Sequence, residues 1–254
     1  MSISWSAKRQ LTYLMFVIVI FLAATFFFWS RFTAPTCSDG KQNQQEKGTD
    51  CGGPCSKECL GDVRDPVVIW SKPLKVRGNK YDAVALVENR NLFLSAKSAS
   101  YQFKFYDERN ILIASREGKT FINPGQKFAV FEAGIDAGTR IPAKAFLEFE
   151  KGVKWEIYKG EKQSLVVTRK EYQDEPSPSL TGLAENKALV TANGVNAVAI
   201  IYDAEGNAIA ASATKAGDIK GGQAAEIFFT WPEEFEEEYG SDEVFLMSES
   251  VSEF

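Results

Sequence analysis

Residues able to cross-link or to bind a cation are concentrated in one short segment, 36–59. The segment holds all four cysteines of the chain, Cys37, Cys51, Cys55 and Cys59, and between them the oxygen-bearing residues Asp39, Asn43, Glu46 and Asp50. Thiols form disulfides or hold zinc. Carboxylate and amide oxygens are the ligands that calcium prefers. This segment is therefore the first candidate site in the chain.

The cysteines favour disulfides over a zinc site. Residues 51–55 read CGGPC, and the glycines and the proline favour a tight chain reversal that brings sulfurs together. A site of four thiolates is the alternative, but the intervals of 13, 3 and 3 residues lack the paired C-x2-C knuckles of zinc proteins. Four cysteines allow three pairings, and the sequence does not choose among them.

The four oxygen-bearing residues form a candidate calcium site within the cross-linked loop. Short spacing and a constrained backbone suit a hard cation, although the pattern does not match an EF-hand loop. In the alternative interpretation these are turn residues, whose side chains accept hydrogen bonds from the nearby backbone. Calcium is the only cofactor that the sequence suggests, and no cofactor is expected otherwise.

An apolar stretch in front of this segment has the length of a membrane span. Residues 11–29 carry no charge and, at about 1.5 Å per helical residue, extend close to the ~30 Å hydrocarbon core of a bilayer. We predict an uncleaved anchor at 11–30, because the run is too long for the apolar part of a signal peptide. Lys8 and Arg9 favour a cytoplasmic tail at 1–10. The clustered cysteines favour an oxidising exterior for the rest of the chain.

Composition excludes several classes of function. The 254 residues include no histidine, which removes Ser-His-Asp and Cys-His nucleophile systems and every histidine metal site. The net charge of −5 argues against nucleic acid as a partner, because phosphate binding needs a basic surface. We therefore expect a protein that is not an enzyme.

Beyond residue 60 the sequence repeats itself at a period of about 97 residues, which suits a whole domain rather than a solenoid unit. VALVEN (84–89) matches TGLAEN (181–186), and the stretch 101–115 matches 196–212. KAFLEF (144–149) is aligned with DEVFLM (242–247). The alternation of apolar and polar residues over 101–105 predicts a half-buried strand.

Turn residues recur at roughly ten-residue intervals between such stretches. The sequence thus predicts a mainly β protein: two tandem antiparallel sandwiches of the immunoglobulin or fibronectin type, at 63–158 and 159–254, behind one transmembrane helix. Polar residues 159–162 would link the two as consecutive domains with some relative motion.

These motifs carry two resemblances. The segment 37–55 resembles a C-x-D-G-x-x-N-x-x-E-x-x-x-D-C-G-G-x-C motif of bacterial and archaeal surface proteins. The order of a hydrophobic-Glu-Asn block, a strand, Tyr-Asp with a turn, and Pro-Gly or Gly-Gly-Gln before a Phe-containing strand resembles FxLyD domains and the related late-embryogenesis-abundant-14-like sandwiches. The second resemblance implies a β-sandwich fold and an extracytoplasmic location, and it carries over no catalytic residue.

Other motifs match catalytic signatures only in part. Gly118-Lys119-Thr120 resembles the end of a P-loop but lacks its first glycine, and Ser212-Ala213-Thr214-Lys215 fits S-x-x-K without the accompanying K-T-G. We interpret the acidic run at 233–243 as a solvated loop. Asn89 and Asn186 are interpreted as strand-end caps. Trp70, Trp155 and Trp231 are expected to pack in cores or at the domain junction.

These observations predict a single-pass protein of a prokaryotic cell envelope. Its tail at 1–10 would lie in the cytoplasm, its anchor at 11–30 in the lipid bilayer, and a disulfide-rich stalk at 31–62 and both β domains outside. The expected role is non-enzymatic binding or scaffolding, with an envelope protein or polymer as partner. The alternatives are a calcium-stabilised adhesion protein and a hydrolase that uses carboxylates or a Ser-Lys pair.

Overall fold

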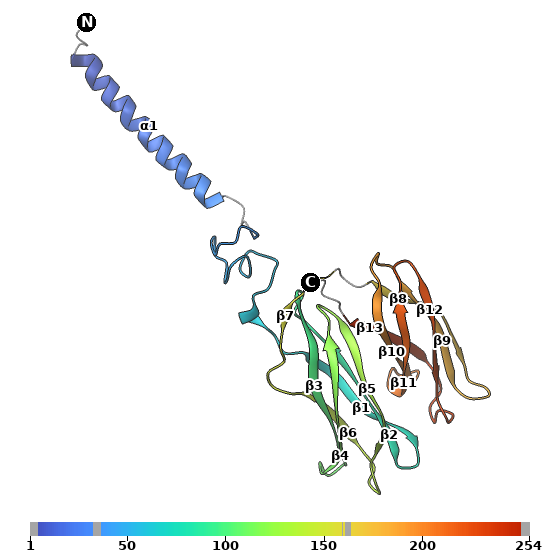
Figure 1. Ribbon diagram of the computed structural model, residues 1–254. Helices are drawn as coiled ribbons and strands as arrows, with labels where there is room; N and C mark the ends of the chain where they lie inside the picture. Colours follow the sequence, from blue (N-terminus) through green and yellow to red (C-terminus); the bar gives the residue numbers. More distant parts are fainter. Residues whose placement is uncertain (1–4, 33–36, 159, 161–163, 250–254) are drawn as a thin grey trace. The chain divides into compact units, whose positions relative to one another are not determined.

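The computed structural model describes residues 5–32, 37–158, 160 and 164–249, and the chain divides into two units between Lys57 and Glu58 (Figure 1). The first unit contains a long helix and the cysteine segment up to Lys57, so Cys59 belongs to the second unit. The second unit contains every β-strand of the described residues.

Helix α1 spans Trp5–Phe32, which gives 28 residues and a length of about 42 Å. It has the apolar composition needed to cross a bilayer, a property that membrane anchors share with signal sequences. The predicted anchor lies inside this helix, but the helix begins earlier, so the predicted tail is helical from Trp5 onward. The Arg9 guanidinium lies 5.5 Å from the centre of the Trp5 ring, a favourable cation–π geometry.

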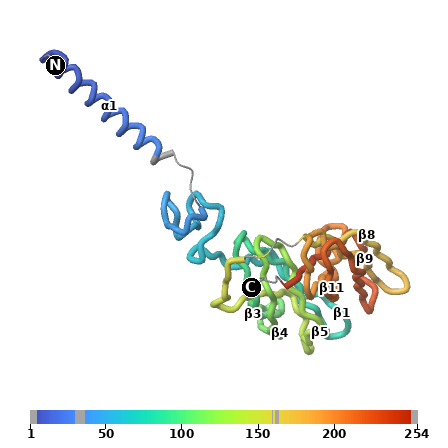
Figure 2. Tube along the Cα trace, turned by 45° about the horizontal axis from the view of Figure 1, so that its top comes forward, coloured from blue at the N-terminus to red at the C-terminus, as the bar shows by residue number. Residues whose placement is uncertain are grey.

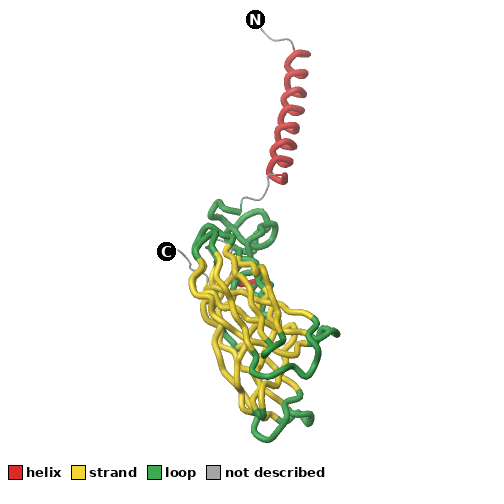
Figure 3. Tube along the Cα trace, turned by 90° about the vertical axis from the view of Figure 1, so that its right-hand side faces the viewer, coloured by secondary structure: helices red, strands yellow, loops and turns green. Residues whose placement is uncertain are grey.

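The second unit is built from four antiparallel sheets within the described residues, and their strands are coloured yellow in Figure 3. The first half of the unit contains β1 (Val67–Arg77), β2 (Lys80–Glu88), β3 (Leu94–Tyr106), β4 (Leu112–Ile122), β5 (Lys127–Asp136), β6 (Lys144–Phe149) and β7 (Glu156–Ile157). The second half contains β8 (Leu165–Gln173), β9 (Ser179–Asn186), β10 (Ala192–Tyr202), β11 (Ala208–Ile219), β12 (Ala224–Thr230) and β13 (Ser241–Glu249). The 3-10 helix η1 (Leu60–Asp62) precedes β1.

The two halves have the same strand order. In the first half, the sheets are β1-β2-β5 and β4-β3-β6, with β7 paired to the start of β3. In the second half, they are β8-β9-β12 and β11-β10-β13. The mainly β fold and its antiparallel pairing are therefore as the sequence predicts.

Alternating side chains produce the core of the first half. Tyr101, Phe103 and Phe105 of β3 are buried, whereas Gln102 and Lys104 between them are less buried and face away. The buried side chains of β3 pack against those of β2 and β5 in one apolar layer. A corresponding layer in the second half joins β9 and β12 to β10. The alternation predicted for 101–105 is thus confirmed.

A third apolar layer joins the two halves, and we call it the seam. It is formed by Leu74, Val84 and Ala129 of sheet β1-β2-β5 and by Ile200, Ala208, Ala211 and Phe245 of sheet β11-β10-β13. The four sheets therefore stack with three apolar layers between them, and Figure 2 shows the two halves side by side. Because the seam packs like a core, the halves form one compact unit.

The sequence predicts two linked domains with some relative motion, whereas the seam packs the two halves against each other. Lys72 Nζ donates a hydrogen bond to the Ala208 carbonyl at 2.8 Å, and the Gln126 amide donates to the Leu246 carbonyl at 2.9 Å. These bonds cross the seam near opposite edges of sheet β1-β2-β5. Of the predicted linker at 159–162, only Gly160 lies within the described residues.

The register corrects one part of the internal alignment. Tyr106 lies opposite Lys144, whereas the equivalent Tyr202 lies opposite Ser241. Lys144 therefore corresponds to Ser241 and not to Asp242, so the alignment of 144–149 with 242–247 is wrong by one residue. The error arises because both strands carry apolar residues at neighbouring positions, and a shift of one residue exchanges the two faces.

The three tryptophans of the β unit pack against its apolar layers, as predicted. Trp231 is 7% exposed within the core of the second half, and its indole N–H donates to the Ala211 carbonyl at 3.1 Å. Trp70 packs against the seam, and Trp155 packs against the core of the first half.

The seam makes a matched pair of phenylalanine substitutions informative. Phe245→Ala opens a cavity between the halves and is expected to lower the free energy of unfolding by about 3 kcal/mol. Phe228→Ala, at a position 58% exposed on β12, is expected to change it by less than about 0.5 kcal/mol. Chemical denaturation of both variants measures the difference. Two separate unfolding transitions in the parent protein would contradict the shared seam.

Candidate functional site

All four cysteines are oxidised. Cys37 and Cys55 are bonded to each other with their Cα atoms 5.6 Å apart, and Cys51 and Cys59 are also disulfide-bonded. The predicted disulfides are therefore present, and the Cys37–Cys55 pair resolves part of the connectivity that the sequence left open. No free thiolate is left to hold zinc, because a bonded sulfur lacks the negative charge of a metal ligand.

The candidate calcium ligands accept hydrogen bonds from the loop itself. The two carboxylate oxygens of Asp50 accept the backbone N–H groups of Asp39 and Gly40, both at 2.9 Å. Asp39 accepts the N–H of Lys41 at 2.9 Å and the side-chain amide of Asn43 at 2.8 Å. Backbone donors thus occupy positions at which a cation would bind. This is the arrangement of the turn-residue interpretation.

Glu46 is the most buried member of the set, with 6% of its surface exposed. One carboxylate oxygen accepts the N–H of Asn43 at 3.1 Å, and the other lies 3.1 Å from the sulfur of Cys55. Since this sulfur is in a disulfide, it has no proton to donate. Cys37, Glu46 and Cys55 lie close enough together to hold a metal ion, but the two sulfurs are bonded to each other. The carboxylate therefore packs against the disulfide.

The two asparagines singled out by the repeat are buried caps. The Asn89 amide donates to the carbonyls of Leu94 and Asn123 at 3.0 and 2.8 Å, and its oxygen accepts the N–H of Asn91 at 3.0 Å. This side chain therefore fastens the end of one strand to the loops of the neighbouring sheet.

Asn186 repeats this pattern in the second half. Its amide donates to the carbonyls of Val190 and Ile219 at 2.8 and 2.9 Å, and its oxygen accepts the N–H of Ala188 at 3.0 Å. The interpretation of Asn89 and Asn186 as caps is confirmed.

The acidic run at 233–243 is only partly a solvated loop. Glu233 forms an ion pair with Arg77 at 3.2 Å and Glu236 with Lys75 at 3.1 Å, so the run contacts the first half of the unit. Both pairs are exposed, so water and salt screen them and each contributes little to stability. The run therefore joins the two halves at its amino-terminal end.

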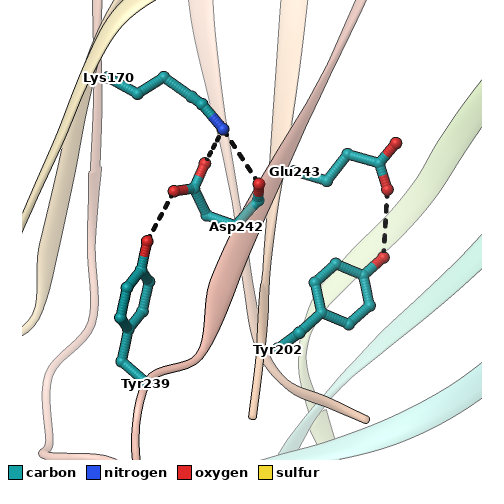
Figure 4. A network of polar contacts seen from close by, with 5 residues as sticks. All are labelled: Lys170, Tyr202, Tyr239, Asp242 and Glu243. Carbon is teal, nitrogen blue, oxygen red and sulfur yellow. Dashed lines mark hydrogen bonds and ion pairs between the residues drawn. The ribbon is translucent and has the colours of Figure 1, made fainter. Parts of the chain in front are cut away.

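The end of the run forms the network in Figure 4. Asp242 contacts the ammonium of Lys170 on β8 and accepts the hydroxyl of Tyr239 at 2.8 Å. The next residue, Glu243, points to the other face of the sheet and accepts the hydroxyl of Tyr202 at 3.4 Å. Burial, reinforced by these carboxylates, raises the pKa of both tyrosines to about 12. Both phenols donate their hydroxyl proton in a hydrogen bond to a carboxylate oxygen.

Ser212 and Lys215 do not form a nucleophile and base. Both lie on β11, where Ser212 is opposite Ala199 and Lys215 is opposite Asn196 in an uninterrupted stretch of register. Side chains alternate along a strand, so residues three positions apart project from opposite faces. The S-x-x-K chemistry needs both groups on one side, and this strand separates them.

Two cavities flank the seam, one along β1 and the other along β5, the two edge strands of sheet β1-β2-β5. The first, the acidic cavity, has a volume of about 200 Å³ and is lined by Asp82 and by glutamates of the run at 233–237. Burial raises the pKa of Asp82, and the N–H of Gly134, which its carboxylate accepts at 2.8 Å, acts in the opposite direction.

The second cavity, the basic cavity, has a volume of about 260 Å³. Its wall contains Phe121, Phe131, Phe245 and Met247, and its charged residues are Lys119 and Lys215. Lys119 belongs to the sequence that resembles the end of a P-loop, and Lys215 belongs to the S-x-x-K sequence. Sequence reasoning missed the cavity itself, because its residues come from β3, β4, β5, β10, β11 and β13 and no local spacing connects them.

Comparison of the chain with models of known protein families finds no match. Comparison with curated protein sequences finds none either. The resemblance to FxLyD and late-embryogenesis-abundant-14-like domains therefore depends on the residues quoted above.

The hydrogen bonds of Asp50 predict how the cysteine loop responds to substitution. Asp50→Ala removes the acceptor for two backbone N–H groups and is expected to destabilise the closed loop by about 1–2 kcal/mol. Reductant should then open the Cys37–Cys55 disulfide about 5- to 30-fold faster. Alkylation and mass spectrometry of the full chain in detergent measure this rate, with the exposed Asp65→Ala as control. If calcium organised the loop instead, a chelator would accelerate opening in the parent protein.

The asparagine caps predict a second effect. Asn89→Ala and Asn186→Ala each leave two carbonyl groups without their donor, all buried except the partly buried one of Val190, and should lower the free energy of unfolding by about 2–4 kcal/mol. Replacement of the exposed amide of Gln173 by alanine should change it by less than about 0.5 kcal/mol. Equal effects at all three sites in denaturant titrations would mean that the buried amides are not caps.

Proposed function

We propose that this protein is a single-pass membrane protein that holds a rigid β unit outside the cytoplasm as a non-enzymatic binding or scaffolding module of a cell envelope. One observation carries the proposal: a helix with an uncharged stretch long enough to cross a bilayer, residues 11–29, precedes a loop in which every cysteine is oxidised. Disulfides persist in oxidising compartments, and an apolar helix at the amino terminus delivers the rest of the chain across the membrane.

The binding role is supported by the construction of the β unit. Three apolar layers and hydrogen bonds across the seam hold the four sheets in one arrangement. A rigid body with fixed faces binds a partner at a low cost in conformational entropy. The absence of histidine from the sequence supports a role that is not catalytic.

We also propose that the halves are tandem copies of one sandwich of the immunoglobulin or fibronectin class. The support is the strand order, in which β1 to β6 correspond in turn to β8 to β13, with β7 as an addition. The buried asparagines support it further, because Asn89 and Asn186 end equivalent strands and bond equivalent loops. This arrangement is the one expected from the resemblance to FxLyD and late-embryogenesis-abundant-14-like domains.

The topology is tested in cells that express the full chain. The protein should remain in the membrane fraction after alkaline carbonate extraction, and a protease added outside spheroplasts should digest the β unit. Its cysteines should resist alkylation until a reductant is added. Recovery of the chain in the cytosol with four reactive thiols would contradict the proposal.

The orientation is tested by charge reversal. Lys8→Glu with Arg9→Glu removes the positive charges in front of the apolar run and should reduce the externally digested fraction, because basic residues stay on the cytoplasmic side. Lys41→Glu with Lys47→Glu is the matched control behind the span and should leave that fraction unchanged. The same response in both variants would contradict the proposed orientation.

A further inference from the structure

We propose that the basic cavity beside the seam binds a small aromatic carboxylate, with Lys119 and Lys215 holding the carboxylate and the phenylalanine wall holding the ring. The cavity lies wholly within the β unit. The proposal is therefore independent of the anchor and of the side of the membrane that the unit occupies.

The charge of the cavity is the first argument. Its lining includes two lysines and no acidic residue, although acidic side chains outnumber basic ones by 34 to 29 in the chain. In the described part of the protein, neither Lys119 nor Lys215 has a carboxylate partner. The exposed Lys75 near the seam differs, since it forms an ion pair with Glu236. Two unpaired ammonium groups at one cavity favour an anion.

The carboxylate that bonds to the cavity wall is already engaged. Glu132 accepts the hydroxyl of Tyr101, a residue of the cavity wall, at 2.8 Å. Gly118 lets these two groups meet, because a Cβ at that position would lie 2.4 Å from both the tyrosine hydroxyl and the glutamate oxygen. The hydroxyl is thus directed to Glu132, and the lysines determine the charge at the cavity.

The wall is the second argument. It combines three phenylalanines with Met247, and aromatic rings and thioethers both make favourable contacts with an aromatic ligand. Thr120, Thr214 and Asn196 add a few polar groups beside the lysines. An apolar wall with a few convergent polar groups is the usual composition of a small-molecule site, and such sites occur preferentially where two domains meet.

The size is the third argument. At about 260 Å³ the cavity is slightly smaller than the range of ~300–1,000 Å³ for drug-sized ligands, so it suits one or two fused rings. The acidic cavity does not offer a comparable site for an anion, because its acidic side chains repel negative charge.

Met247 provides a direct test. The chain has three methionines, and Met247 is the one in the β unit, so its methyl group reports on this cavity. Full-length protein labelled with [methyl-13C]methionine is placed in nanodiscs of zwitterionic lipid and titrated with 2-naphthoate. We expect saturable shifts of the Met247 resonance and none of Met15. The neutral analogue 2-naphthamide should bind about 3- to 30-fold more weakly, because it lacks two ion pairs.

Substitutions locate the site. Lys119→Gln with Lys215→Gln should weaken 2-naphthoate binding about 3- to 30-fold and leave binding of the amide unchanged, and the corresponding arginine variant should restore it. Lys220→Gln removes one exposed positive charge away from the cavity and should have no effect. No shift of Met247 at millimolar 2-naphthoate would overturn the proposal. Equal binding of the carboxylate by the parent and the double glutamine variant would overturn it as well.

Discussion

Burial of two strands on both of their faces is the constraint on which the rest of this structure depends. Alternate residues of β2 face the core of the first half, and Val84 between them faces the seam. In the same way, β10 contributes Ala199 and Ile201 to the core of the second half and Ile200 to the seam. Because both faces of these strands are covered, the two halves cannot separate without exposing apolar surface to water.

The same constraint explains why the outer sheets differ from the inner ones. On the first half's outer sheet, Gln102, Lys104 and Glu148 lie in adjacent strands, and Lys104 pairs with Glu148. On the second half's outer sheet, Glu226 of β12 is equivalent by strand register to Ala129 of β5. Ala129 faces the seam, whereas Glu226 lies on an outer sheet. Charged residues on the two outward faces keep those faces hydrated, so the stack ends after four sheets.

The cysteine loop is held in one conformation without an apolar core of its own. Its order comes from disulfides, from the two N–H groups bound by Asp50 and from the packing of Glu46 against Cys55. Cross-links limit the conformations of the unfolded segment, and the internal hydrogen bonds select one of those that remain. The acidic residues that suggest calcium in the sequence thus accept hydrogen bonds from the backbone of the loop.

Local patterns in the sequence predicted the long helix, the buried face of one strand and two side-chain caps. The uncharged run predicted α1, the alternation at 101–105 predicted the buried face of β3, and the repeated Glu-Asn predicted the caps at Asn89 and Asn186. These features arise from the period of a helix or a strand, or from hydrogen bonds to adjoining loops, and a single sequence records them directly. The unbroken apolar runs of β2 and β10 also indicate burial on two faces. Such a run does not identify which surface packs against each face.

The seam, the Cys37–Cys55 pairing and the basic cavity arise from contacts between residues far apart in the sequence. Lys119 and Lys215 are 96 positions apart in a sequence where each belongs to an unrelated motif, and they line one cavity because three of the sheets stack on one another. Packing partners are selected by the complementarity of whole faces, which no local spacing encodes.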